Sequence, residues 1–315
     1  MSQATKERIL NVLIVLAAIA LAAVIVYPQY QMAQPTKVKI LVDRSLLSLP
    51  VFIADEKGLF KKNKVETEIV FANDPDERQK ALLQNECELT YLPWLLVLKE
   101  PHPYKVIASV ESRILKPVES LLTVPKSRIK RIRDLRGKKI GVMRAHEVYL
   151  DNLLTHLPKT VKGSKKVYIE PDEIEMVIRD RKVDALFLLE PYRTVAIGAG
   201  AKVFQDAPLS YFIQRGYPVA AYCISNQLLT KNRIGARRIR DGLNGAIREI
   251  LKDRDEAKRI LFARMDLTGE FLSTKVAEFQ RLREINDEAL KSFVQKFNLT
   301  VDPESAIANP IIFER

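Results

Sequence analysis

Hydrophobic residues recur along the first part of the chain in short runs that alternate with amphipathic stretches. The runs predict strands at 38–42, 65–72, 89–92, 104–110 and 121–124. The amphipathic stretches predict helices at 49–59, which ends near Gly58, and at 75–85. Strands that alternate with helices are typical of a largely parallel sheet with helices packed on its faces.

A second, similar series follows. It predicts strands at 138–143, 167–170 and 183–189 and helices at 145–157 and 172–181. A strand at 219–224 and a long helical tail at 234–297 complete the pattern. The 315 residues are enough for two lobes that each bury a core. We therefore expect an α/β protein of two lobes with the chain crossing between them.

The N-terminus carries an apolar run at 9–26 that is interrupted only by Asn11 and preceded by Lys6 and Arg8. Roughly 20 apolar residues span a bilayer as a helix, whereas a cleaved signal peptide has an apolar core of about 7–15. A small-x-small triplet lies inside the run, where cleavage is disfavoured. The sequence favours an uncleaved transmembrane anchor at 1–28, with a cleaved signal peptide as the alternative.

The charges around this run predict the orientation of the chain. Basic residues stay on the cytoplasmic side, so the polar tether at 29–36 and everything after it would lie outside. The expectation is a single-pass protein of the inner membrane whose bulk faces the periplasm or the cell exterior.

The amino-acid composition restricts the kinds of site that this chain can form. The chain has two cysteines and three scattered histidines, so no metal site of usual spacing is predicted and no cofactor is implied. Phosphate-loop and hydrolase signatures are absent from the sequence. The net charge is +12, and eight of the basic residues lie in 126–139. That segment contains no aromatic residue, which favours a solvated face and argues against a nucleic-acid partner.

Three motifs occur in an order found in a known family. They are 43–60 (DRSLLSLPVFIADEKGLF), 124–126 with 132–142 (VPK and IRDLRGKKIGV), and 179–192 (RDRKVDALFLLEPY). Together they resemble the periplasmic solute-binding proteins for nitrate, sulfonates, taurine and thiamine precursors. The resemblance implies a type II periplasmic binding fold with the ligand in the cleft between the lobes.

The resemblance also implies a domain division. Lobe one would comprise 37–123 and the return segment 217–315, and lobe two would comprise 124–216, with hinges near 123–125 and 216–218. It sets Cys87 and Cys223 on neighbouring strands, so a disulfide between them stays open. Residues 144–147 (RAHE) replace the small pair usual in the family, which argues against nitrate, taurine and simple sulfonates.

Ligands of open α/β sheets bind at the carboxyl ends of the strands. Eight side chains at predicted strand ends are therefore candidates for ligand contact: Ser45, Ser48, Tyr91, Trp94, Arg144, His146, Glu190 and Tyr192. Helix capping is the alternative for the serines, core packing for Trp94 and simple solvation for Arg144. Glu190 and Arg144 follow strands of the same lobe, so we expect both to face the cleft and to pair with each other when it is empty.

These features predict a binding protein, and not an enzyme, that delivers a small organic solute to an inner-membrane ABC permease. A membrane-anchored sensor or scaffold with the same fold is one alternative. An enzyme of the thiamine-pyrimidine or menaquinone-precursor type is another.

Overall fold

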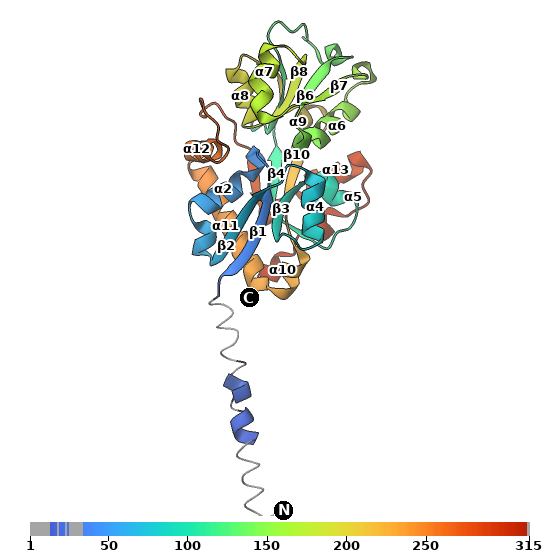
Figure 1. The fold of residues 1–315 in the computed structure, drawn as a ribbon. Helices are drawn as coiled ribbons and strands as arrows, with labels where there is room; N and C mark the ends of the chain where they lie inside the picture. The colour runs from blue at the N-terminus through green and yellow to red at the C-terminus, as the bar shows by residue number, and fades with distance from the viewer. Residues whose placement is uncertain (1–12, 18, 23, 25–33, 314–315) are drawn as a thin grey trace, which may run out of the picture.

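The computed structural model describes residues 13–17, 19–22, 24 and 34–313. The chain forms two α/β lobes, each built on one sheet, stacked end to end (Figure 1). Lobe one has a six-stranded sheet. Its strands, in sheet order, are β11 (Glu278–Arg281), β4 (Lys105–Ser112), β10 (Tyr217–Ile224), β3 (Leu89–Pro93), β1 (Thr36–Val42) and β2 (Val65–Phe71).

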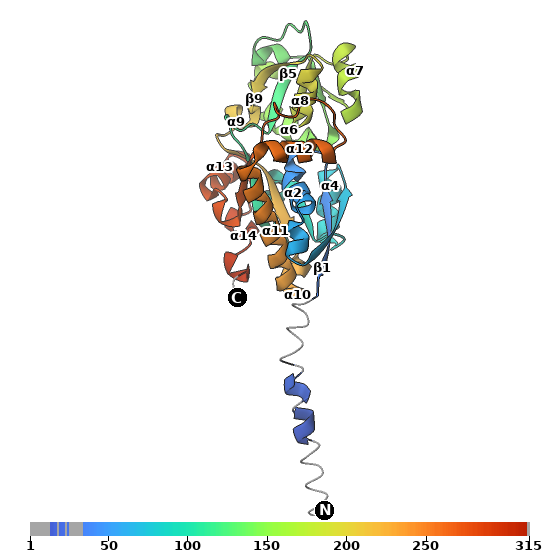
Figure 2. The same cartoon turned by 90° about the vertical axis from the view of Figure 1, so that its left-hand side faces the viewer.

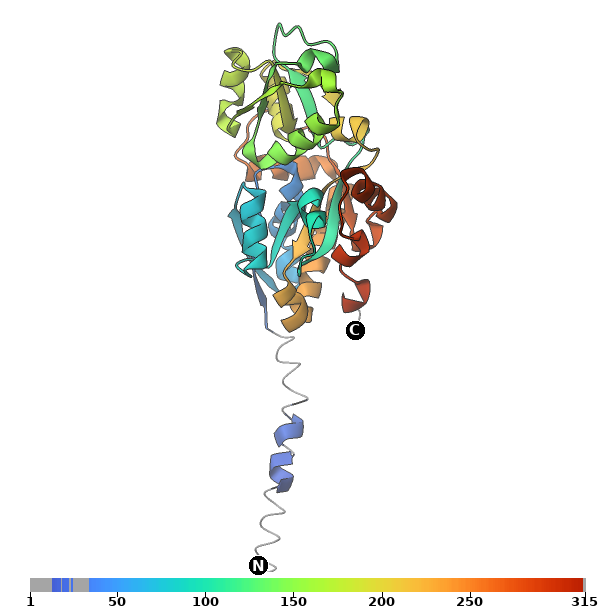
Figure 3. The same cartoon turned by 90° about the vertical axis from the view of Figure 1, so that its right-hand side faces the viewer.

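Strand β1 is parallel to β2 and β3, whereas β10 runs antiparallel to β3 and β4. Helices flank both faces of this sheet (Figures 2 and 3). One side carries α2 (Leu49–Glu56), α3 (Leu59–Lys62), α11 (Arg233–Lys252) and α12 (Arg254–Arg264). The other carries α4 (Pro75–Leu83), α5 (Trp94–Lys99), α13 (Asp287–Phe297) and α14 (Pro303–Ala306), and α10 (Asn226–Lys231) lies at the end remote from lobe two.

Lobe two has a five-stranded sheet. Its strands, in sheet order, are β7 (Lys165–Tyr168), β6 (Lys139–Val142), β8 (Ala185–Leu189), β5 (Glu119–Thr123) and β9 (Lys202–Asp206). Its helices are α6 (Glu147–His156), α7 (Ile174–Arg179), α8 (Tyr192–Gly198) and α9 (Pro208–Phe212). Short 3-10 turns include η1 (Leu46–Ser48), η2 (Ile132–Leu135), η3 (Arg144–His146) and η4 (Lys159–Val161).

Two segments differ from the sequence prediction. The run at 121–124 was assigned to lobe one, but β5 pairs with β8 and β9, so the chain crosses between the sheets at 113–118 and not at 123–125. The return crossing lies at 213–216 and shares only Gly216 with the predicted hinge at 216–218, because Tyr217 and Pro218 already pair with β4 as part of β10. The tail predicted as helical contains β11, which adds an edge strand to β4.

Helix α11 illustrates how the tail joins the core of lobe one. Its apolar residues Ile239, Leu243, Ile247 and Ile250 recur every three or four positions and are all buried. At Gly242 a Cβ atom would lie 2.7 Å from the ring of Phe60, so glycine is what allows this close approach. The helix therefore packs tightly on α2 and α3.

The predicted anchor at 1–28 lies for the greater part outside the described residues. Among the described residues, no helix is long and apolar enough to span a bilayer. Cys87 and Cys223 are both buried and free, so the disulfide left open by the sequence is not formed here.

Candidate functional site

The carboxyl ends of β1 and β6 bring polar residues of both lobes together. Asp43 directly follows β1, and Ser45 then caps η1 by accepting a 3.1 Å hydrogen bond from the Leu47 N–H. In lobe two, η3 follows β6 and places His146 at the interface. A backbone hydrogen bond of 2.8 Å from the Leu46 N–H to the Glu190 carbonyl joins the lobes beside these residues.

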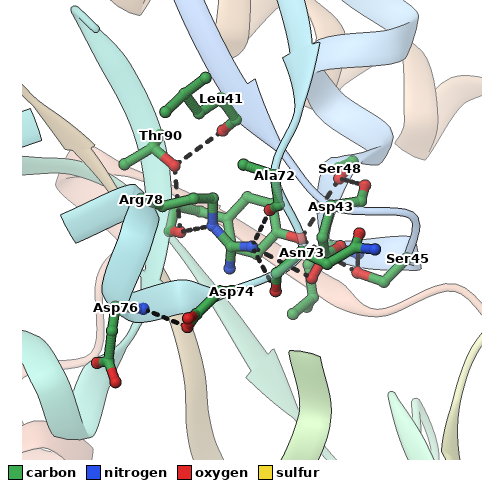
Figure 4. Close-up of polar contacts among 12 residues, drawn as sticks. Leu41, Asp43, Ser45, Ser48, Ala72, Asn73, Asp74, Asp76, Arg78 and Thr90 are labelled. Atoms are coloured by element: carbon green, nitrogen blue, oxygen red, sulfur yellow. Dashed lines mark hydrogen bonds and ion pairs between the residues drawn. The ribbon is translucent and has the colours of Figure 1, made fainter. Parts of the chain in front are cut away.

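Arg78 of α4 is the buried cation of the site, with 1% of its surface exposed. Its guanidinium donates to the carbonyl oxygens of Ala72 at 2.6 Å, Asn73 at 3.2 Å and Tyr91 at 3.3 Å (Figure 4). Its Nη1 lies 3.8 Å from Asp43 Oδ2. A buried charge requires such partners, so this pair is a fixed part of lobe one.

The Asp43 carboxylate is only half satisfied. Its Oδ1 is buried and has no hydrogen-bond partner among the described residues. The Tyr91 hydroxyl lies 3.3 Å from Ser45 Oγ and 3.4 Å from Ser48 Oγ, and Ser48 Oγ donates to the Asp43 backbone carbonyl at 2.6 Å. Burial, reinforced by the charge of Asp43, raises the pKa of the Tyr91 phenol, which keeps it neutral.

His146 faces this cluster from lobe two. It is 1% exposed, and within the described part of the chain neither ring nitrogen has a hydrogen-bond partner. Burial, opposed by the charge of Asp43 and aided by that of Arg78, lowers its pKa from 6.5 to about 4. The imidazole is therefore neutral near pH 7 and offers one unused donor and one unused acceptor.

A cavity of about 90 Å³ lies between the lobes and is lined by His146. Other residues in its wall are Arg44, Asn73, Arg144, Glu170 and Tyr192. The unpaired nitrogens of His146 belong to a residue of this wall, whereas the unpaired Oδ1 of Asp43 lies in the neighbouring polar cluster, one residue before the lining residue Arg44. These unpaired atoms complement a ligand that carries N–H donors and one acceptor, and the guanidinium groups of Arg44 and Arg144 add two cations to the cavity wall.

Glu190 and Arg144 do not form the predicted pair. The buried Glu190 carboxylate instead accepts from Arg193 at 3.3 Å, the Thr194 hydroxyl at 2.9 Å and the Lys275 N–H at 3.0 Å. The exposed Arg144 lines the cavity, and its guanidinium lies 4.2 Å from the ring centroid of Tyr168. Glu190 thus holds the segment after α12 to lobe two, which was not foreseen.

The remaining predicted residues divide between core and site. Trp94 is fully buried and donates its indole N–H to Ser109 Oγ at 2.9 Å, so it packs within lobe one. Tyr192 lines the cavity, and burial raises its pKa with a smaller contribution from Asp43. Ser45, Ser48 and Tyr91 lie beside Asp43. The sequence prediction missed Asp43, Arg44 and Arg78, although Asp43 and Arg44 open the first quoted motif.

Among the described residues, no group of three or more His, Cys, Asp or Glu side chains is arranged to hold a metal ion.

Comparisons with solved structures identify the fold. The aliphatic sulphonate-binding protein SsuA of Escherichia coli is 18% identical, with a TM-score of 0.66 over 88% of this chain and 93% of that one. SsuA of Xanthomonas axonopodis pv. citri, bound to MOPS, is 16% identical, with a TM-score of 0.67 over 88% and 99%. At these identities the likeness concerns the fold, which is that of periplasmic binding proteins, as predicted.

Sequence comparisons identify the family. A Haemophilus influenzae protein named for thiamine biosynthesis is 32% identical over 97 residues, and the match spans only 29% of the length of that relative. The family model described as NMT1/THI5 like matches residues 47–257, about two thirds of the chain. The chain therefore belongs to the NMT1/THI5-like family.

Proposed function

We propose that this chain is an extracytoplasmic solute-binding protein that captures a small organic molecule between its lobes. The observation that supports this most directly is the set of unpaired buried atoms on Asp43 and His146, which come from opposite lobes. A buried polar group without a partner costs about 1–3 kcal/mol, and folded proteins retain few of them. A ligand that completes their hydrogen bonds would recover this cost.

The polarity of these atoms favours a nitrogen-containing ligand. Two acceptors and one donor suit a ring or side group with N–H donors next to an acceptor nitrogen or oxygen. The name of the Haemophilus relative and the family description are consistent with a heterocyclic precursor of thiamine. A sulfonate group carries only acceptor oxygens, which suit Arg44 and Arg144 but leave the unpaired Asp43 oxygen without a donor.

Ligand entry would require the lobes to separate. The cavity of about 90 Å³ is smaller than the 300–1,000 Å³ typical of small-molecule pockets. Closure would be held by the Leu46–Glu190 backbone bond and by the contacts of Thr274 with Thr194 and of Lys275 with Glu190. The crossings at 113–118 and 213–216 are the segments that would bend.

Ligand screening of the full-length chain in detergent tests the proposal. Pyrimidines and other amine-bearing heterocycles should raise the melting temperature, since a ligand at about 100 times its Kd stabilises by about 2.7 kcal/mol. In Asp43→Asn the same ligands should bind at least roughly 30-fold more weakly. A sulfonate that stabilises both proteins equally, with no response to heterocycles, would contradict the assignment.

The proposed route of delivery is an inner-membrane ABC permease, with the chain held by its N-terminal segment. The support for the anchor is the apolar run at 9–26 and the two basic residues before it. Full-length protein is expected in membrane fractions, with residues after 29 cleaved by protease added from outside. Soluble protein that begins near residue 30 would show instead that the segment is a cleaved signal.

A sensor or scaffold is the second candidate, because the small cavity and the interlobe hydrogen bonds describe a cleft that is already closed. Solution scattering separates the two functions. A transport binder should have a larger radius of gyration without ligand than with it. A scaffold should keep one radius of gyration with every compound tested.

A further inference from the structure

The end of lobe two remote from the cleft carries a dense group of cations. It is formed by the segments 126–139 and 159–165, which meet where β6 and β7 begin. Lys139 and Lys165 are register partners there, and the Lys165 N–H donates to the Lys138 carbonyl. The carboxyl ends of the same strands face the candidate site, so the two surfaces lie at opposite ends of the strands (Figure 1).

We call this surface the basic tip and define it by its ten exposed cations. They are Lys126, Arg128, Lys130, Arg131, Arg133, Arg136, Lys139, Lys159, Lys162 and Lys165. None of the ten has an ion-pair partner within the described residues, and the neighbouring Lys138 pairs with Asp184 at 3.6 Å. Cations crowded in this way repel one another, so the tip lowers stability unless an anionic partner binds it.

The one carboxylate within these segments shapes the tip without neutralising it. Asp134 accepts hydrogen bonds of 2.9 Å from the Lys130 and Arg131 N–H groups. These backbone bonds lower its pKa, so it stays ionised while it holds the turn that presents both side chains. The Ser164 hydroxyl donates to the Leu135 carbonyl and fastens the second segment to the first.

We propose that the basic tip docks on a bilayer with anionic headgroups. The cations lie on loops, on 3-10 turns and at the first residues of β6 and β7, so no long helix is presented to a nucleic-acid groove. Neither segment contains an aromatic residue on which a base could stack. Mobile lipid phosphates can rearrange to meet scattered point charges, and the apolar run at 9–26 already predicts a membrane-proximal protein.

Co-sedimentation with vesicles tests the docking surface. The full-length chain is held by its N-terminal segment in phosphatidylcholine nanodiscs and mixed with separate vesicles of phosphatidylcholine, with or without phosphatidylglycerol. Binding is expected only with phosphatidylglycerol and should weaken at least tenfold between about 0.1 M and 1 M salt. Equal binding to both vesicles, or to neither, would overturn the proposal.

Charge reversal locates the surface. The variant Lys130→Glu, Arg131→Glu, Arg133→Glu should bind at least roughly 100-fold more weakly, because each basic residue contributes about a fivefold gain at an anionic membrane. The matched control Lys61→Glu, Lys62→Glu, Arg254→Glu changes net charge equally on exposed lobe-one positions and should bind like the parent. Equal losses in both variants, or tighter binding to duplex DNA than to the anionic vesicles, would contradict the inference.

Discussion

Replacement of Arg78 by methionine is expected to destabilise the protein by about 3–5 kcal/mol. Methionine fills similar space but leaves the buried Asp43 carboxylate without its cation. It also removes the donors to the carbonyl groups of Ala72, Asn73 and Tyr91. Chemical denaturation of the full-length chain in detergent measures the change in the free energy of unfolding.

Lys80 on the same helix supplies the control. It is exposed, so Lys80→Met should change the free energy of unfolding by less than about 0.5 kcal/mol. Adding Asp43→Asn to Arg78→Met should recover part of the loss, because no full charge is then buried alone. Equal stability of the Arg78 and Lys80 variants would show that the buried ion pair contributes nothing to folding.

The fold was largely accessible from the sequence because strand and helix periods are local properties. The runs at 38–42, 65–72 and 219–224 correspond to β1, β2 and β10. The sheet to which a strand belongs is decided by its partners, which is why 121–124 was placed in the wrong lobe. Strand β11 was missed because its four residues pair at an edge and are too few to show a period.

The site was less accessible because its key contacts come from tertiary burial. Helix α4 has the composition of a solvated helix, and Arg78 becomes its buried cation only once β3 and the turn at 72–73 surround it. For Glu190 a local signal was available. Arg193 lies three residues further on, at the spacing of helical neighbours, and it displaces Arg144 as the partner. Asp43 and His146 come together only when the two lobes pack against each other, and the local pattern of hydrophobic residues contains no information on that packing.

Replacement of His146 by leucine is expected to stabilise the empty protein while it weakens ligand binding. At pH 7 the neutral imidazole is buried with both ring nitrogens unpaired, and an apolar side chain of similar size removes this cost of about 1–3 kcal/mol. The same change removes one donor and one acceptor from the cavity wall. Affinity for the ligand should therefore fall at least roughly tenfold as the melting temperature of the free protein rises.

The stability gained in His146→Leu should be larger at acid pH, and the sign of this pH dependence follows from the direction of the pKa shift. The pKa of His146 is about 4 in the folded protein, against 6.5 for an ordinary histidine, so between these pH values the unfolded state binds the extra proton. Parent stability therefore falls as pH drops from about 6.5 to 4, by about 3 kcal/mol from this group, and His146→Leu is spared that loss. Buried Glu119, whose pKa rises to about 7, acts in the opposite direction but equally in both proteins.

Comparison with a second histidine separates this effect from a general response to leucine. The His156 Nδ1 lies 2.8 Å from the Asn152 carbonyl oxygen, so His156→Leu breaks a hydrogen bond and should lose stability. Denaturation at pH about 5 and 7 for the parent and both variants gives the required differences. If His146→Leu is less stable than the parent at both pH values and binds ligand as tightly, the histidine belongs to the packing of the lobes. If stability rises while affinity falls, the protein has kept an unfavourable buried imidazole because the ligand requires it.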